Sequence, residues 1–99
     1  MNKRKRSIER EDSLPTISSF YGITIFMWFR DHAPAHFHVE YSGHKASVDI
    51  KSLEILEGFL PRRALNLVLD WAEIHQGELV HNWEACRKQI QPAKIRPLE

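Results

Sequence analysis

The stretch HFHVEYSGHKASVDI, residues 36–50, decides the fold of this chain. Apolar and polar residues alternate with a period of two on both sides of the dipeptide at 42–43, which is the pattern of two β-strands joined by a tight turn. A two-residue turn there places His36 opposite Asp49. Apart from the pair Tyr41 and His44 beside the turn, apolar residues then face apolar ones and polar residues face polar ones. A shift of one residue would destroy that match, so the pattern predicts one hairpin register.

The same alternation predicts one strand before the hairpin, over residues 20–30, and a short strand after it, over residues 53–57. Downstream, apolar residues recur at helical spacing over residues 61–89. We predict one long helix there, weakened or kinked at Gly77, with a true break at Gly77 as the alternative. The predicted fold is therefore α+β: an antiparallel sheet of three to four strands with one long, possibly kinked C-terminal helix packed on one face.

The length of 99 residues indicates one domain. Residues 1–13 are highly charged and lack hydrophobic periodicity, so we expect a disordered basic arm there and a single α+β domain over residues 14–99. Cys86 is the only cysteine, which rules out an intramolecular disulfide and favours a reducing cytoplasm. No apolar run approaches the roughly 20 residues of a membrane span, and no secretory signal is recognisable.

Charge is distributed unevenly, although the net charge is only +1. Residues 1–12 carry a net +2 and residues 85–99 a net +3, which leaves about −4 on the middle of the chain. Basic ends on an acidic body are compatible with nucleic-acid binding. The alternative interpretation is that both ends are simply solvated.

The distinctive chemical feature is a histidine cluster within residues 31–40, DHAPAHFHVE. On a strand, His36 and His38 project from the same face about 6–7 Å apart, and Glu40 continues the row. His32 lies on the preceding turn and could fold back toward them. One hypothesis is a divalent transition metal such as zinc, iron or nickel, bound by His32, His36, His38 and Glu40. Asp49, opposite His36, would then orient the ring from the second shell.

Two other interpretations of the cluster remain open. The first is metal-free acid–base chemistry by His32, His36 and His38, with Arg30 contacting a phosphate. The second is purely structural, since histidines on the polar face of a half-exposed sheet need no function. Trp28 also falls on the face of the sheet that carries His36 and His38, which we call the histidine face. Its exposure there would indicate a binding surface.

Several motifs, taken in order, resemble a small bacterial family known as domain-of-unknown-function family 4160. They run from the N-terminal part of the chain to the predicted helix and comprise Pro15-Thr16-Ile17-Ser18, Phe20-Tyr21-Gly22-Ile23, Asp31-His32-x-Pro34-x-His36-Phe37-His38-Val39-Glu40-Tyr41, Leu60-Pro61-x-Arg63-Ala64-Leu65, Trp71-Ala72-Glu73 and Asn82-Trp83. The resemblance covers about residues 14–98. It implies no catalytic residues, because the family has no established activity. It does imply a gene context like that of toxin–antitoxin pairs, and hence a small protein partner encoded nearby.

The leading hypothesis is therefore a small cytoplasmic interaction protein of a toxin–antitoxin-like module. Its histidine-bearing face would bind a partner, a metal or nucleic acid. The first alternative is an enzyme, either a histidine-dependent ribonuclease or a small metallohydrolase. The second is a nucleic-acid-binding regulator. No membrane association is expected, and a homo-oligomer is compatible with the sequence.

Overall fold

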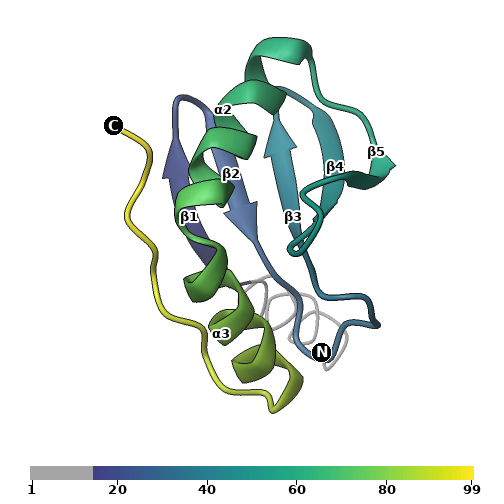
Figure 1. Cartoon of the computed structure of the whole chain (residues 1–99), viewed down its shortest axis with the longest axis vertical. Coiled ribbons are helices and arrows are strands. Elements are labelled where there is room, and N and C mark those ends of the chain that lie inside the picture. Colours follow the sequence, from purple (N-terminus) through teal and green to yellow (C-terminus); the bar gives the residue numbers. More distant parts are fainter. Residues whose placement is uncertain (1–14) are drawn as a thin grey trace, which may run out of the picture.

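The computed structural model describes residues 15–99, so the predicted basic arm over residues 1–13 lies outside the described residues. In the described part, the strands form one antiparallel sheet in chain order, β1-β2-β3-β4-β5 (Figure 1). The strands are β1 (Thr16–Phe20), β2 (Ile23–Phe26), β3 (His36–Tyr41), β4 (His44–Asp49) and β5 (Ile55–Gly58). Five strands replace the three to four that the alternation predicted.

The central hairpin has the predicted register. Strands β3 and β4 pair residue for residue from Tyr41↔His44 beside the turn to His36↔Asp49 at the far end. This prediction is confirmed because two independent constraints agree on it: the period of the side chains and the length of the turn.

The prediction of one strand over residues 20–30 is wrong. A turn at Tyr21 and Gly22, with φ of 51° and 79°, separates β1 from β2. Positive φ at both central residues is the geometry of the tight hairpin turns that match strand twist. The tyrosine at the first turn position hid this signal, because Asn-Gly and Asp-Gly are the usual dipeptides there.

Two helices, α2 (Arg62–Ile74) and α3 (Gln76–Arg87), replace the single predicted helix. The interruption lies at His75, with φ −112° and ψ 23°, rather than at Gly77. The amide of Gln76 holds the start of α3 against the sheet by donating to the carbonyl of Ile50, 2.7 Å away. Neither described helix has the length and apolar character of a membrane-crossing segment.

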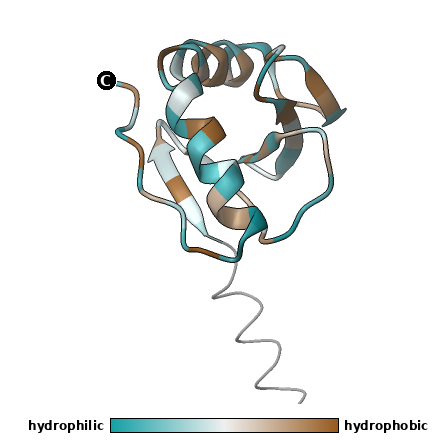
Figure 2. Cartoon of the chain, turned by 60° about the horizontal axis from the view of Figure 1, so that its bottom comes forward, coloured by the Kyte–Doolittle hydropathy of each residue, from teal (hydrophilic) through white to brown (hydrophobic). Residues whose placement is uncertain are grey.

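Both helices lie over one face of the sheet, as Figure 1 shows. Hydrophobic and hydrophilic residues alternate along both helical ribbons, as expected where one side of each helix is buried (Figure 2). Trp71 of α2 is fully buried, with its ring 5.5 Å from that of Phe20 and 6.0 Å from that of Phe37. Its indole N–H donates to the carbonyl of Arg96, so the core also anchors the C-terminal segment.

The C-terminal segment runs beside β1, and the N–H of Ile95 donates to the carbonyl of Ile17 over 2.8 Å (Figure 1). The side chain of Asn82 exchanges two hydrogen bonds with the backbone of Ala93. These contacts cover the outer edge of β1, which would otherwise present unpaired backbone groups.

Gly77 offers a test of the helix boundary. A methyl group added there meets nothing within 4 Å, and the residue lies in the first turn of α3. We expect Gly77→Ala to stabilise the protein by about 0.5–1 kcal/mol, because alanine loses less backbone entropy on folding. Urea denaturation would measure this gain. A clear loss of stability would contradict the helical assignment of residue 77.

Candidate metal centre

The turn before β3 brings a carboxylate onto the histidine face. Arg30 has φ of 55°, and its N–H donates to the carbonyl of Cys86 at the end of α3. After this fixed bend, the chain places Asp31 beside the first residues of β3. The side chain of Asp31 is only 7% exposed.

Three side chains converge on one point. Oδ2 of Asp31 lies 2.9 Å from Nε2 of His36 and 2.8 Å from Nε2 of His38. The potential ligand atoms of these three residues all lie within 4.8 Å of one another. In the described part of the chain, they form a group able to hold a metal ion. Two ligands at about 2.1 Å from a tetrahedral metal would be about 3.4 Å apart, so a bound ion would require the two short contacts to lengthen by about half an ångström.

The hydrogen bonds of His36 indicate which nitrogen is available to a metal. Its Nδ1 lies 2.6 Å from the carbonyl oxygen of Pro34, which can only accept, so Nδ1 carries a proton. This contact directs Nε2 toward Asp31. A metal-binding histidine characteristically donates its other ring N–H to a backbone carbonyl or a carboxylate in this way.

Asp31 is held in its ionised form. Burial by itself raises the pKa of this carboxyl, but hydrogen bonds from His38 and the His32 N–H and the nearby imidazoles lower it by more. The net result is a pKa below the usual value of an aspartate. The ionised carboxylate accepts but cannot donate, so each imidazole nitrogen in contact with it must either carry a proton or share a cation with it.

The histidine face is less open than the sequence predicted. The residue His36 is 4% exposed, and its ring lies 5.1 Å from that of Trp83 on α3. The ring of His38 is 19% exposed and is stacked against Trp28 and Phe26, at 4.8 and 5.3 Å. Trp28 itself is 46% exposed, on the face where the alternation placed it.

The structure places the other predicted site residues outside the three-residue group. His32 is adjacent, with Nδ1 3.0 Å from the second oxygen of Asp31, but its side chain is 87% exposed. Glu40 is exposed and lies further along β3, where it pairs in register with Lys45. Arg30 is exposed on the preceding turn.

Asp49 does not supply the carboxylate that orients His36. It pairs with His36 in register, but its Oδ1 accepts hydrogen bonds from the N–H groups of Lys51 and Ser52 at the next turn. The carbonyl of Pro34 contacts the other ring nitrogen of His36 instead, and Asp31 is a possible metal ligand. Asp31 belongs to the cluster recognised at residues 31–40, but the sequence pattern assigned it no role. The signal that could have found it is its position as the only ionisable side chain other than histidine in the seven residues before His38.

The fold and site together define a small α+β domain with a two-histidine, one-carboxylate group at the start of β3, where His36 packs against Trp83 of α3. Residues 22–84 match the family profile described as "Domain of unknown function (DUF4160)". The chain belongs to this family, as the motif resemblance indicated. No curated protein and no solved structure matched significantly.

Proposed function

We propose that this domain binds one divalent transition-metal ion through Asp31, His36 and His38. The observation that carries the proposal is the convergence of two imidazole nitrogens and one carboxylate oxygen on a shared, largely buried point. Two nitrogen donors in a set of three favour zinc, iron or nickel over magnesium or calcium, which prefer oxygen ligands.

The two contacts of His36 are compatible with a metal ion, as they are with an imidazolium–carboxylate ion pair between His36 and Asp31. One ring nitrogen faces a carbonyl and the other faces an ionised carboxylate, and both of these groups only accept. A neutral imidazole carries one N–H and satisfies only one of the two. A cation between Nε2 and Asp31 would satisfy the second contact without a second proton on a buried ring.

Three protein ligands leave at least one coordination position open. That position would supply Lewis acidity to a bound ligand, which is the chemistry that the metallohydrolase alternative requires. Asp31 and the two histidines would hold the metal, while Trp28 and Phe26 restrict how the ring of His38 can turn.

Metal titration tests the proposal. We expect metal-free, untagged protein to bind one equivalent of Zn²⁺ or Ni²⁺ in equilibrium dialysis. His36→Gln and His38→Gln should each weaken binding by at least about tenfold, because each removes one ligand. His81→Gln is the matched control, since His81 is exposed on α3 outside the group. Equal affinity in all four proteins would refute the site.

A partner protein is a second candidate, favoured by a different surface. Strand β5 is the last strand of the sheet, and Leu56 within it and Phe59 directly after it are 42% and 63% exposed. We propose that the small protein encoded nearby, implied by the family resemblance, adds a strand at this edge. The double change Leu56→Lys and Phe59→Lys should abolish co-purification with that protein while metal binding persists. Unchanged co-purification would rule out this edge.

A further inference from the structure

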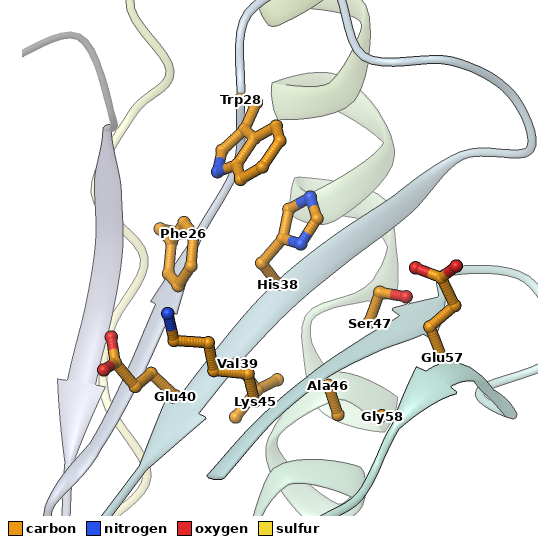
Figure 3. A pocket seen from close by; sticks show the side chains of 10 residues that line it. All are labelled: Phe26, Trp28, His38, Val39, Glu40, Lys45, Ala46, Ser47, Glu57 and Gly58. Atoms are coloured by element: carbon orange, nitrogen blue, oxygen red, sulfur yellow. The ribbon is translucent and has the colours of Figure 1, made fainter. Parts of the chain in front are cut away.

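A hollow adjoins the metal group on the uncovered face of the sheet. Figure 3 views it with the helices behind the strands. The hollow measures about 690 Å³, which is within the usual range for small-molecule sites. His38 belongs both to the metal group and to the lining of the hollow. A ligand on an open metal position would therefore extend into this space.

The pairing of the strands places four of the side chains that line the hollow in one row across the sheet. Phe26, His38, Ser47 and Glu57 pair in succession from β2 to β5, so one row of side chains crosses four strands. Adjacent strands are about 4.8 Å apart, so Glu57 is about 10 Å from His38 across the sheet. One end of the row thus adjoins the metal group, and the other end carries a carboxylate.

One wall of the hollow is aromatic. Trp28 and Phe26 both lie nearly parallel to the ring of His38, at 18° (Figure 3). Trp28 remains 46% exposed, whereas Trp71 and Trp83 are 0% and 5% exposed. An exposed indole beside a hollow is a surface on which a planar ring can stack.

The rest of the lining is polar and of mixed charge. It includes the ammonium of Lys45, the hydroxyl of Ser47 and the carboxylates of Glu40 and Glu57 (Figure 3). In the described part of the chain, none of these charged groups forms an ion pair. They are therefore available to a ligand, the ammonium to an anion and the carboxylates to N–H or O–H donors.

We propose that the hollow binds a nucleotide unit, with its phosphate on the metal and its base stacked on Trp28. This inference depends on the proposed metal site. The metal selects an anionic group, and Trp28 selects a planar ring close to it. The carboxylates of Glu40 and Glu57 accept from ribose hydroxyls and base amino groups. A simple aromatic acid would use the ring and anion sites but would leave these carboxylates unused.

Trp28 provides a direct readout because it is the only exposed tryptophan of the three in the chain. Protein loaded with one equivalent of zinc, and dialysed to remove free zinc, is titrated with the four ribonucleoside 5′-monophosphates and with a short 5′-phosphorylated single-stranded RNA. Zinc is chosen because it is not paramagnetic. We expect saturable quenching of tryptophan emission. Tighter binding of the RNA than of every mononucleotide would indicate that the bound nucleotide unit is the 5′ end of an RNA strand and not a free mononucleotide.

Two variants test the contacts by calorimetry. Trp28→Ala should weaken nucleotide binding by about 5- to 150-fold, the usual cost of losing a stacking partner, when both the parent protein and the variant are fully loaded with zinc. Tyr21→Asn is the matched control, since Tyr21 is 60% exposed at the distant β1–β2 turn. Asparagine also tolerates the positive φ at that position.

The outcomes separate this inference from the metal site. Zinc binding in dialysis without any quenching by nucleotides would overturn the nucleotide assignment and leave the metal site intact. Equal quenching with and without zinc would overturn the placement of the phosphate on the metal. Failure to bind zinc would overturn the metal site itself, and with it this inference as stated.

Discussion

Asp31→Asn is expected to weaken metal binding by at least about 100-fold. This loss is larger than the 10- to 100-fold typical of altering a residue that hydrogen-bonds to a metal ligand without contacting the metal. The carboxylate is the single anionic member of the three-residue group, and its Oδ2 lies within 2.9 Å of both histidine nitrogens. An amide of the same size keeps the shape of the side chain but removes the negative charge that balances the cation. Competition with a chromophoric chelator would measure the change.

Asp49→Asn is the matched control for Asp31→Asn. Both aspartates lie next to His36, one in contact with its ring and the other across the β3–β4 pair. Because the carboxylate of Asp49 binds the turn at Lys51 and Ser52, its amide variant should keep metal affinity within about threefold. Equal losses in the two variants would mean that position 49 also acts on the metal group.

Asp49 should instead affect stability in acid. The hydrogen bond from the Ser52 N–H, assisted by that of Lys51, holds the pKa of Asp49 below its usual value. A depressed folded-state pKa adds stability above the unfolded-state pKa, and this stability is lost as the pH falls through the folded-state pKa. We therefore expect Asp49→Asn to be less stable than the parent chain at neutral pH. The difference should shrink in acid, as followed by urea denaturation from about pH 7 to about pH 2.

Gly58→Ala should be among the most destabilising single substitutions in the sheet. A Cβ at this position would lie 2.1 Å from the carbonyl oxygen of Lys45 and 2.8 Å from Cα of Ala46. Both atoms belong to the backbone of β4, so the strand itself would have to move. The φ of +86° adds strain for any side chain. We expect a loss of at least about 3 kcal/mol from backbone strain and steric overlap together.

Gly43→Ala separates these two causes. Gly43 has nearly the same φ, +85°, but an added Cβ there meets nothing within 4 Å. In this variant the free energy of unfolding should fall only by the strain of a side chain at positive φ, about 1 kcal/mol. Thermal or urea denaturation of both variants gives the comparison. Losses of equal size would show that β4 and β5 do not approach as closely as the coordinates indicate.

Local signals predicted the centre of the sheet and the strand at its β5 edge, and failed at its β1 edge. The β3–β4 register follows from alternation and a two-residue turn, both readable within fifteen residues. Strand β1 and the turn at Tyr21 went unpredicted because that turn lacks the usual Asn or Asp. The helix break was misplaced because its position depends partly on the contact of Gln76 with Ile50, 26 residues away.

The sequence by itself determined that His36 and His38 share a face, because the period of a β-strand is a local property of the backbone. Only the tertiary structure decided that Asp31, rather than Glu40 or Asp49, completes their group. The conformation before β3 depends on the contact between Arg30 and Cys86, residues far apart in the chain. Burial of His36 likewise depends on Trp83. A loop obeys no period, so the direction of its side chains is settled by whatever the rest of the fold packs against it.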